Sequence, residues 1–211
     1  MCIASRYKNF WLLLCAAGLL AACEQRHDPN GNKVTVNPTP GTSADQPALP
    51  VGVDKSPMDM SYYPENYPVL KMQGKAGEKP VARVVYSRPQ KHGRTVFGNL
   101  VEYGKPWRLG ANEATEIEFF RTVTIQQKKV PAGRYVAYCI PHPDKWVVKL
   151  NSDLYTWGLK IDSTKDQFAF EIPVSKTNYP YEFFTMQFQS TERGMELAMM
   201  WDSVKAVLPI Q

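Results

Sequence analysis

The side chains best suited to bind or act on a ligand are concentrated between Tyr86 and Thr115. Regular apolar alternation gives way here to Gly, Pro, Arg, Trp, Asn and Glu, which is typical of a segment that presents functional groups on a rigid scaffold. Arginine forks suit carboxylates and phosphates, and a tryptophan face suits a sugar ring or a cation. The pattern predicts a small-molecule site. Its candidate residues are Arg88, Arg94, Trp107, Arg108, Asn112, Glu113 and Thr115.

The same residues also have a structural interpretation. Buried charges must be paired, so Glu113 could form a buried ion pair with Arg94 or Arg108, and Asn112 could hydrogen-bond its own backbone. Such a network would lock a long connection between two strands. Both interpretations stay open, although holding the fold together accounts for these residues slightly better than any reaction does.

Catalysis on glycans or esters, with Glu113 as general acid or base, is the alternative function. A glycosidase needs two carboxylates about 5–9.5 Å apart, and the second one would come from Glu116, Glu118 or Glu102. If strand alternation holds through Thr115, Glu116 and Glu118 point away from Glu113. That expectation argues against the pair and favours a protein that is not an enzyme.

The histidines and cysteines predict neither a metal site nor a cofactor. Apart from His27, which lies in a predicted tether, only His92 and His142 remain, and a zinc site with Glu113 would require distant loops to meet. The sequence has no H-E-x-x-H, C-x-x-C or EF-hand spacing. No G-x-S-x-G surrounds Ser87, so a nucleophile elbow is not indicated either.

Further residues with possible roles lie later in the chain. Trp157 precedes a glycine in a predicted turn, and an exposed Trp157 near Trp107 would form a platform for stacking a sugar ring. Trp146 and Trp201 fall on apolar alternating faces and are expected in the core. Cys139 lies in an apolar run, where a free thiol usually behaves as a small buried hydrophobe.

The elements that must position these residues are strands, because period-two alternation recurs while no window shows sustained helical periodicity. Turn signals separate the alternating segments. We predict an all-β domain, an antiparallel β-sandwich or jelly-roll-like barrel of eight to nine strands with one short helix at most. The helix is expected around Thr95–Leu100, where Val96, Phe97 and Leu100 would share one side.

The first 22 residues predict a lipoprotein signal peptide. Arg6 and Lys8 form a basic region, and residues 10–20 are an apolar run shorter than the ~20 residues that span a bilayer. The following Leu20-Ala21-Ala22-Cys23 resembles a bacterial lipobox, in which the cysteine is acylated and becomes the first mature residue. Glu24 stands where aspartate would retain the protein in the inner membrane, so we predict the outer membrane, on either face.

The remaining chain divides into a tether and one domain. Residues 23–57 are predicted to be the lipidated cysteine and a disordered, Pro-rich tether, and residues 58–211 a single domain with its core from about residue 69. One acyl chain holds a protein only marginally. Bacterial lipoproteins that resemble this one carry three, so Cys23 should hold the protein firmly to the lipid bilayer.

The net charge of the chain limits which other partners we expect. The formal net charge is +5, and removal of residues 1–22 lowers it to +3. No Lys/Arg cluster is long enough for a nucleic-acid footprint, so we predict no nucleic-acid partner. The expected partner is a small anionic or glycan ligand, or another protein. The oligomeric state stays open.

Several short motifs support a family resemblance. They are Tyr-Ser-Arg-Pro at 86–89, Gly-Arg at 93–94, Phe-Gly at 97–98, Leu-Val at 100–101, Tyr-Gly at 103–104, Trp-Arg at 107–108, Gly-Ala-Asn-Glu-Ala-Thr at 110–115, Pro-Ala-Gly at 131–133 and Trp-Gly at 157–158. Together they resemble the bacterial domain of unknown function numbered 2911, found in exported proteins and lipoproteins, over nearly all of the domain from about residue 75. Glu102 stands where that family usually carries proline, and His92 is inserted before the Gly-Arg pair, which indicates a local loop variation. The resemblance implies a compact, exported β-rich domain without an established biochemical role.

Overall fold

The computed structural model describes residues 54–211. The predicted signal peptide, Cys23 and the tether up to residue 53 lie outside the described residues. Residues 54–211 contain nine strands, one short α-helix and one 3₁₀ turn. These elements are β1 (Met58–Tyr63), α1 (Tyr67–Met72), β2 (Ala82–Ser87), β3 (Glu116–Phe119), β4 (Val123–Ile125), β5 (Lys128–Val130), β6 (Gly133–Pro141), β7 (Lys145–Asn151), η1 (Ser163–Lys165), β8 (Asp166–Thr191) and β9 (Gly194–Ile210).

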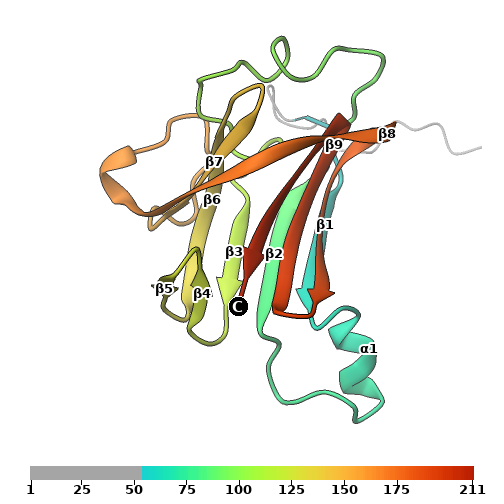
Figure 1. The fold of residues 1–211 in the computed structure, drawn as a ribbon, viewed down its shortest axis with the longest axis vertical. Coiled ribbons are helices and arrows are strands. Elements are labelled where there is room, and N and C mark those ends of the chain that lie inside the picture. The colour runs from blue at the N-terminus through green and yellow to red at the C-terminus, as the bar shows by residue number, and fades with distance from the viewer. Residues whose placement is uncertain (1–53) are drawn as a thin grey trace, which may run out of the picture. The chain divides into compact units, whose positions relative to one another are not determined.

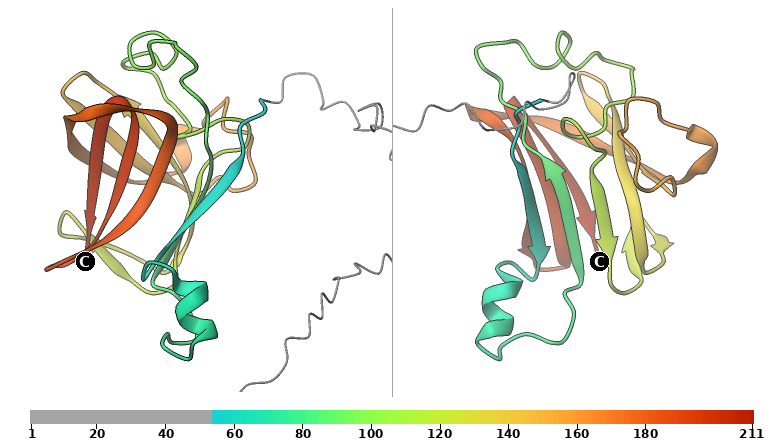
Figure 2. Two further views of the ribbon diagram at one scale, coloured as in Figure 1. Left: turned by 90° about the vertical axis from the view of Figure 1, so that its right-hand side faces the viewer. Right: turned by 180° about the vertical axis from the view of Figure 1, so that it is seen from behind.

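The main sheet is antiparallel, has seven strands and follows the order β1-β2-β3-β6-β7-β8-β9. Sheet neighbours are also neighbours in sequence except between β3 and β6, where the separate β4–β5 hairpin is inserted. The sheet curls into a nearly closed barrel (Figures 1 and 2). The all-β prediction is therefore confirmed, and the barrel is the alternative that the structure adopts.

The curvature depends on β8, which is 26 residues long. Its first part, Asp166–Pro173, pairs with β7, and its second part, Val174–Thr191, pairs with β9. Figure 1 shows β8 crossing the molecule obliquely as it passes from one neighbour to the other. A single strand thus joins the two halves of the sheet, because each half uses a different length of it.

The barrel closes along a line where β8 meets β1 and β2, which we call the seam. Side chains accept the outward N–H groups of β8 there: Met186 donates to Tyr86 Oη (2.9 Å), Phe188 to Ser61 Oγ (3.0 Å) and Ser190 to Glu65 Oε1 (3.2 Å). Farther along, the Phe184 N–H donates to the Pro89 carbonyl at 3.0 Å. The exposed edge of β8 therefore has partners although no continuous backbone ladder forms, which limits the cost of unpaired backbone groups.

The interior is filled by the alternating apolar faces and by a group of aromatic rings. Neighbouring rings of this aromatic cluster have centroids 4.9–6.4 Å apart. Its members are Phe97, Trp107, Trp146, Phe184 and Trp201. Trp146, Trp201 and Cys139 are fully buried, as predicted. Burial raises the pKa of the Cys139 thiol well above its ordinary value, so the thiol is a packing group.

In β9 the alternation of inward-facing and outward-facing residues shifts by one position at Asp202. Met195 to Trp201 face inward at odd positions, whereas Ala206, Leu208 and Ile210 do so at even positions. Asp202 has φ 50°, and the pairing register with β8 shifts beside it. A β-bulge of this kind lets both halves of a bent strand keep their apolar side chains in the core.

The helix predicted at Thr95–Leu100 is wrong in position. That segment consists of turns with one isolated bridge between Phe97 and Val101. Leu100 is exposed there, whereas Val96 and Phe97 enter the core. The observed helix, α1, has a proline in its first turn. At six residues α1 is too short to produce a periodic apolar pattern.

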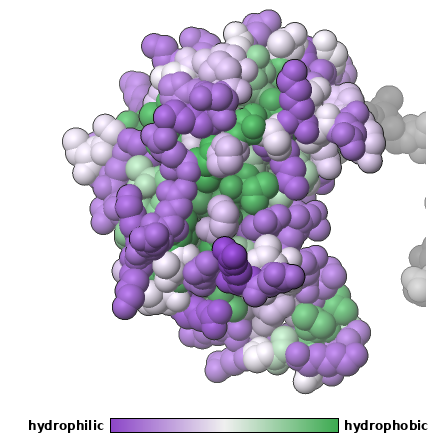
Figure 3. Space-filling model, viewed as in Figure 1, coloured by the Kyte–Doolittle hydropathy of each residue, from purple (hydrophilic) through white to green (hydrophobic). Residues whose placement is uncertain are grey.

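The surface is largely polar in the view of Figure 3, with a separate apolar patch at the lower right, where Figure 1 shows α1. Apolar atoms are visible in the middle of the face that β8 crosses, framed by hydrophilic residues. In residues 54–211 no helix has the length and apolar character needed to cross a membrane.

Candidate functional site

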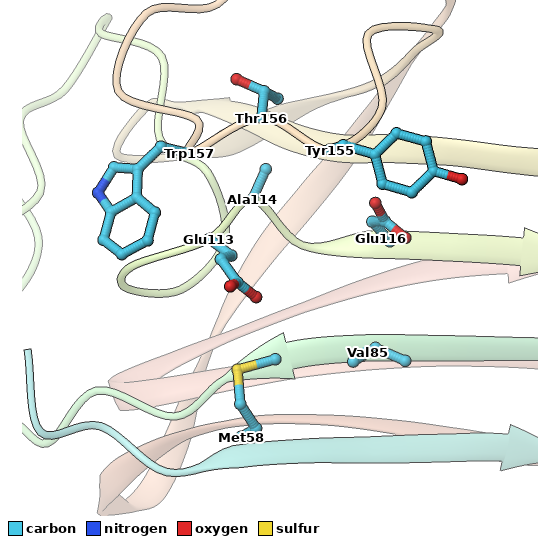
Figure 4. A pocket seen from close by; sticks show the side chains of 8 residues that line it. All are labelled: Met58, Val85, Glu113, Ala114, Glu116, Tyr155, Thr156 and Trp157. Carbon is cyan, nitrogen blue, oxygen red and sulfur yellow. The ribbon is translucent and has the colours of Figure 1, made fainter. Parts of the chain in front are cut away.

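A pocket of about 410 Å³ lies on the outer face of β1, β2 and β3, beside the loop that follows β7. We call it the Glu113 pocket (Figure 4). It is lined by Met58, Val85, Glu113, Ala114, Glu116, Tyr155, Thr156 and Trp157.

The floor of the pocket follows from strand alternation. Val84 and Tyr86 point into the core of the barrel, so Val85 between them points outward. Glu116, the first residue of β3, pairs with Val85 across the sheet. Met58, the first residue of β1, completes the floor.

One wall of the pocket is the turn that carries Tyr155 and Trp157, whose exposed fractions are 84% and 39%. Ala114 N–H donates to the Thr156 carbonyl at 3.1 Å, which ties this turn to the segment before β3. Gly158 has φ +77°, and a Cβ there would lie 3.0 Å from the Cβ atoms of Ala114 and Arg108. A residue larger than glycine would therefore push the wall away from the floor.

Two carboxylates share this pocket. Figure 4 shows the Glu113 side chain between Trp157 and Met58, and the Glu116 carboxylate next to the Tyr155 ring. The expectation that Glu113 and Glu116 point apart is wrong, because β3 begins only at Glu116 and the two residues before it, Ala114 and Thr115, are both buried. Strand alternation therefore does not extend back to Glu113.

Glu116 is held by Arg134, whereas Glu113 is exposed. Arg134 Nη1 lies 3.6 Å from Glu116 Oε2 and donates to the Tyr155 hydroxyl at 3.4 Å. Arg134 also covers the Tyr155 ring, with its guanidinium carbon 5.8 Å from the ring centre, so it connects floor and wall. Within residues 54–211, Glu113 forms no ion pair, and the pairs expected with Arg94 or Arg108 are not made.

Asn112 holds the chain that leads into β1. Its Oδ1 accepts the Asp54 N–H at 2.7 Å, and its Nδ2 donates to the Asp54 carbonyl at 2.8 Å. The predicted bond of Asn112 to its own backbone is thus replaced by a bidentate contact with a segment 58 residues earlier. This contact places residues 54–58 beside the pocket.

Thr115 and Trp107 belong to the structural part of the predicted cluster. Thr115 is fully buried, and its hydroxyl donates to the Leu109 carbonyl at 2.6 Å. Trp107 exchanges two backbone hydrogen bonds with Cys139, at 2.8 and 2.9 Å, and its ring packs in the aromatic cluster. Trp157 consequently shares the pocket with Tyr155 rather than forming a platform with Trp107.

Arg88 is also a structural residue, at the end of the seam. Its Nε donates to the Phe184 carbonyl at 3.2 Å, and its Nη2 donates to Thr185 Oγ1 at 3.1 Å. Its Nη1 lies 3.2 Å from the Asp59 carboxylate. The three nitrogens of Arg88 are therefore all engaged in joining β1 and β2 to β8.

Arg94 and Arg108 have different surroundings. Arg94 is exposed and borders a separate groove, away from Glu113. Burial lowers the pKa of Arg108, an effect partly offset by Asp54. Arg108 Nε is buried and has no hydrogen-bond partner in residues 54–211. The predicted cluster is thus spread over the core, the seam, one pocket and one groove.

The two histidines in the described residues do not join Glu113. His92 is exposed in a turn with φ 52°, and His142 lies between β6 and β7. In residues 54–211 no three or more His, Cys, Asp or Glu side chains are placed to hold a metal ion. No residue of the Glu113 pocket is therefore assigned to a metal.

The prediction missed Tyr155, and it named Glu116 only to argue against its pairing with Glu113. A signal for Tyr155 was present in the sequence, because two aromatic residues flank Thr156 just before a glycine. Arg134 gave no such signal, since its role depends on the β3–β6 pairing that sets it next to β3.

Comparison with known proteins identifies a family but no related protein of known function. Searches of curated proteins and of solved structures each found no match. Residues 68–210 match the family described as protein of unknown function, DUF2911. The matched range includes β2 to β9 and the pocket residues except Met58. The chain therefore belongs to the DUF2911 family.

Proposed function

We propose that the protein is a lipid-anchored domain of the cell envelope that binds a glycan without catalysis in the Glu113 pocket. The observation that carries this proposal is the placement of two exposed aromatic rings, Tyr155 and Trp157, beside the carboxylates of Glu113 and Glu116. Aromatic walls with a few convergent polar groups are typical of small-molecule sites.

The chemistry of the pocket favours sugars over anions. Ionised carboxylates only accept hydrogen bonds, and the hydroxyl groups of a sugar are donors. The apolar face of a sugar ring fits against an indole or phenol ring. An anionic ligand would meet the unpaired carboxylate of Glu113 at close range, since Arg134 pairs with Glu116, and this repulsion is unfavourable even with solvent screening.

The pocket also has some preorganisation. Arg134 holds both Glu116 and Tyr155, and the Ala114–Thr156 hydrogen bond fixes the turn that carries the rings. Side chains and loops that are ordered before binding cost less conformational entropy when the ligand arrives. Glu113 is the adaptable member, because it is exposed and unpaired within residues 54–211.

Glycan binding is tested with full-length protein in detergent, by calorimetric titration with neutral oligosaccharides from envelope polymers. Trp157→Ala should weaken binding about tenfold, the change that corresponds to ~1.4 kcal/mol. Leu159→Ala is the matched control, because Leu159 is 71% exposed on the same loop and does not line the pocket. A second titration uses a quaternary ammonium compound, because aromatic rings can also bind such a cation. Binding of that cation alone, or equal losses in both variants, would contradict the proposal.

The second candidate is a glycan hydrolase, favoured by the presence of Glu113 and Glu116 in one pocket. In this scheme Glu113 is the general acid or base, and Glu116, beside Arg134, is the second carboxylate. A Glu113→Gln protein should then fold normally and lose all turnover of a chromogenic glycoside. If the wild type releases no product over a broad substrate set, the non-catalytic proposal stands.

The membrane anchor rests on the sequence of residues 1–23 and needs its own experiment. Cells that express the full chain are fed an alkyne fatty acid, and the purified protein is examined for label. We expect label in the wild type and none in Cys23→Ser. Unlabelled wild type would remove the lipid anchor from the proposal and leave the glycan site untouched.

A further inference from the structure

A second concave region, the basic groove, lies at the end of β2 and has a volume of about 540 Å³. It is lined by Asp54, Lys55, Ser56, Pro57, Arg88, Gln90, His92, Arg94 and Phe183. Residues 54–57 form one side of the groove, whereas the next residue, Met58, lines the Glu113 pocket. The two concavities are thus bordered by consecutive residues of the chain.

The acidic side chains near the groove have hydrogen-bond or ion-pair partners. The Asp54 carboxylate accepts the backbone N–H and the hydroxyl of Ser56. Glu182 accepts the His92 N–H at 2.8 Å, and Asp202 pairs with Lys91 at 2.6 Å. Of these acids only Asp202 is ion-paired, whereas Asp54 and Glu182 are turned toward neutral donors and keep their negative charge.

The positive charges of the groove differ in availability. Arg88 is paired with Asp59 in the seam. Lys55 and Arg94, by contrast, form no ion pair within residues 54–211. Against the single carboxylate of Asp54 in its lining, the groove therefore has two cations without an ion pair, Lys55 and Arg94.

Arg94 is also held in place before any ligand arrives. Its Nε donates to the Lys91 carbonyl at 2.9 Å, and its Nη2 donates to the Gln90 carbonyl at 2.5 Å. Both acceptors are neutral, so they fix the guanidinium without cancelling its charge. A preorganised guanidinium loses less side-chain entropy when it binds a carboxylate or phosphate.

The groove has an apolar side as well. Phe183 is 38% exposed, and Arg88 stacks on its ring with 5.7 Å between guanidinium carbon and ring centre. The ring leaves a face for the carbon skeleton of a ligand whose charged group reaches Arg94. This combination suits a small organic anion better than a bare inorganic ion.

We propose that the basic groove binds the carboxylate or phosphate group of a small organic anion, with Arg94 and Lys55 as its charged ligands and Phe183 against its carbon skeleton. The site is separate from the Glu113 pocket and does not depend on glycan binding there. Such a group is carried by acidic sugars and by phospholipid headgroups.

The test measures binding of three anions, glucuronate, glucose 1-phosphate and glycerol 3-phosphate, to full-length protein in detergent by calorimetry, with neutral glucose as reference. We expect the anions to bind, and the affinity to fall about tenfold or more in Lys55→Gln/Arg94→Gln. Binding should also weaken as salt rises from low to physiological concentration. Glycerol 3-phosphate represents the lipid headgroup, so its rank against the two sugar anions identifies the source.

Arg121→Gln is the matched control. Arg121 is exposed and unpaired within residues 54–211, and it follows β3 near the start of β2, at the opposite end from the groove. Both variants should melt like the wild type, because the side chains they change are exposed. No anion binding, binding that survives the double substitution, or an equal loss in Arg121→Gln would overturn the proposal. Loss of neutral glycan binding in Trp157→Ala reports on the other pocket alone.

Discussion

At the scale of single residues, the polar stretch before β3 contains side chains with opposite surroundings. Glu113 is exposed and faces a pocket, whereas Thr115, two residues later, is completely buried. The Thr115 hydroxyl is the hydrogen-bond donor to the Leu109 carbonyl, and Gly110 lies against the Ser87 backbone beside it. The structural interpretation of this stretch thus applies to Thr115, whereas Glu113 has no structural partner within residues 54–211.

Thr115→Val should destabilise the fold. Valine keeps the volume of threonine and removes the hydroxyl, so the Leu109 carbonyl loses its donor in a buried place. An unsatisfied buried group costs about 1–3 kcal/mol, which should appear as a lower urea midpoint. Glu113→Gln is the comparison, and it should unfold at the wild-type midpoint because Glu113 has no partner within residues 54–211. An unchanged midpoint for Thr115→Val would exclude the structural role.

Gly158→Ala should damage the Glu113 pocket without touching any ligand. The added Cβ would contact Ala114 and Arg108 at 3.0 Å, and alanine at φ +77° is strained. We expect a loss of about 1–3 kcal/mol in unfolding free energy and weaker glycan binding, because the wall with Tyr155 and Trp157 moves. Gly77→Ala is the control, since nothing lies within 4 Å of its Cβ position and its φ is ordinary. Equal stability of the two variants would contradict this account.

The sequence named Glu113 and Trp157 as candidates, and both line the pocket, but it placed Glu116 on the wrong side. Alternation is a property of an extended strand, and it fails at Ala114 and Thr115, which are consecutive and both buried. Ala114 is held there by a contact with a distant segment, because its N–H donates to the Thr156 carbonyl. No local pattern reports such a contact.

At the scale of elements, the seam depends on Tyr86 more than on any other side chain of β2. Its hydroxyl accepts the Met186 N–H at 2.9 Å and lies 3.2 Å from the Met186 carbonyl and from Asp59 Oδ2. Burial raises the pKa of Tyr86 to about 12, partly offset by the Met186 backbone. The neutral phenol is therefore the form that the folded barrel requires.

This requirement predicts a loss of stability at alkaline pH. The folded pKa of Tyr86, about 12, lies above its ordinary value of 10.0, so the contribution of Tyr86 is complete below pH 10 and is lost as pH rises to 12. A shift of two units corresponds to about 2–3 kcal/mol. Unfolding of wild type and Tyr86→Phe by urea at a series of pH values should show a stability gap that narrows over this range. A gap that stays constant with pH would show that Tyr86 does not titrate in the seam.

The elements themselves divide into those that the sequence could reveal and those that it could not. Strands such as β7 and β9 have one face in the core, so apolar and polar residues alternate along their sequence and predict a strand. The helix was misplaced because Val96 and Phe97 reach the core from an irregular turn, where apolar spacing mimics a helical face. β8 could not be foreseen as one strand, because its change of partner from β7 to β9 is a tertiary event.

At the scale of the whole molecule, acid stability is linked to Asp166, at the start of β8. Its carboxylate accepts hydrogen bonds from Lys149, Asn151 and Tyr138, each at 2.8 Å to its nearer oxygen. Burial alone would raise the pKa of Asp166, but these bonds outweigh burial and hold the pKa below the ordinary 3.8. The stabilisation is therefore complete above pH 3.8 and is lost as pH falls through the lower folded value.

Asp166→Asn should accordingly lower the unfolding free energy by about 1–3 kcal/mol at neutral pH, since Lys149 loses its charged partner. The difference from wild type should shrink below about pH 4, where the wild-type carboxyl also becomes neutral. Asp144→Asn is the control, because Asp144 is exposed in the turn before β7 and forms no ion pair within residues 54–211. If wild type, Asp166→Asn and Asp144→Asn all unfold in acid at the same pH, the stabilising role of Asp166 is contradicted.

The seam also bears on how the barrel forms in time. Three of its hydrogen bonds join residues 100 to 127 positions apart, whereas β8 and β9 are joined by a short turn and can pair locally. Closing a long loop costs entropy before the contact is made, and folds rich in distant contacts fold in milliseconds to seconds. We therefore expect the β8–β9 hairpin to form early and the docking of β1 and β2 along it to be the slow, late step.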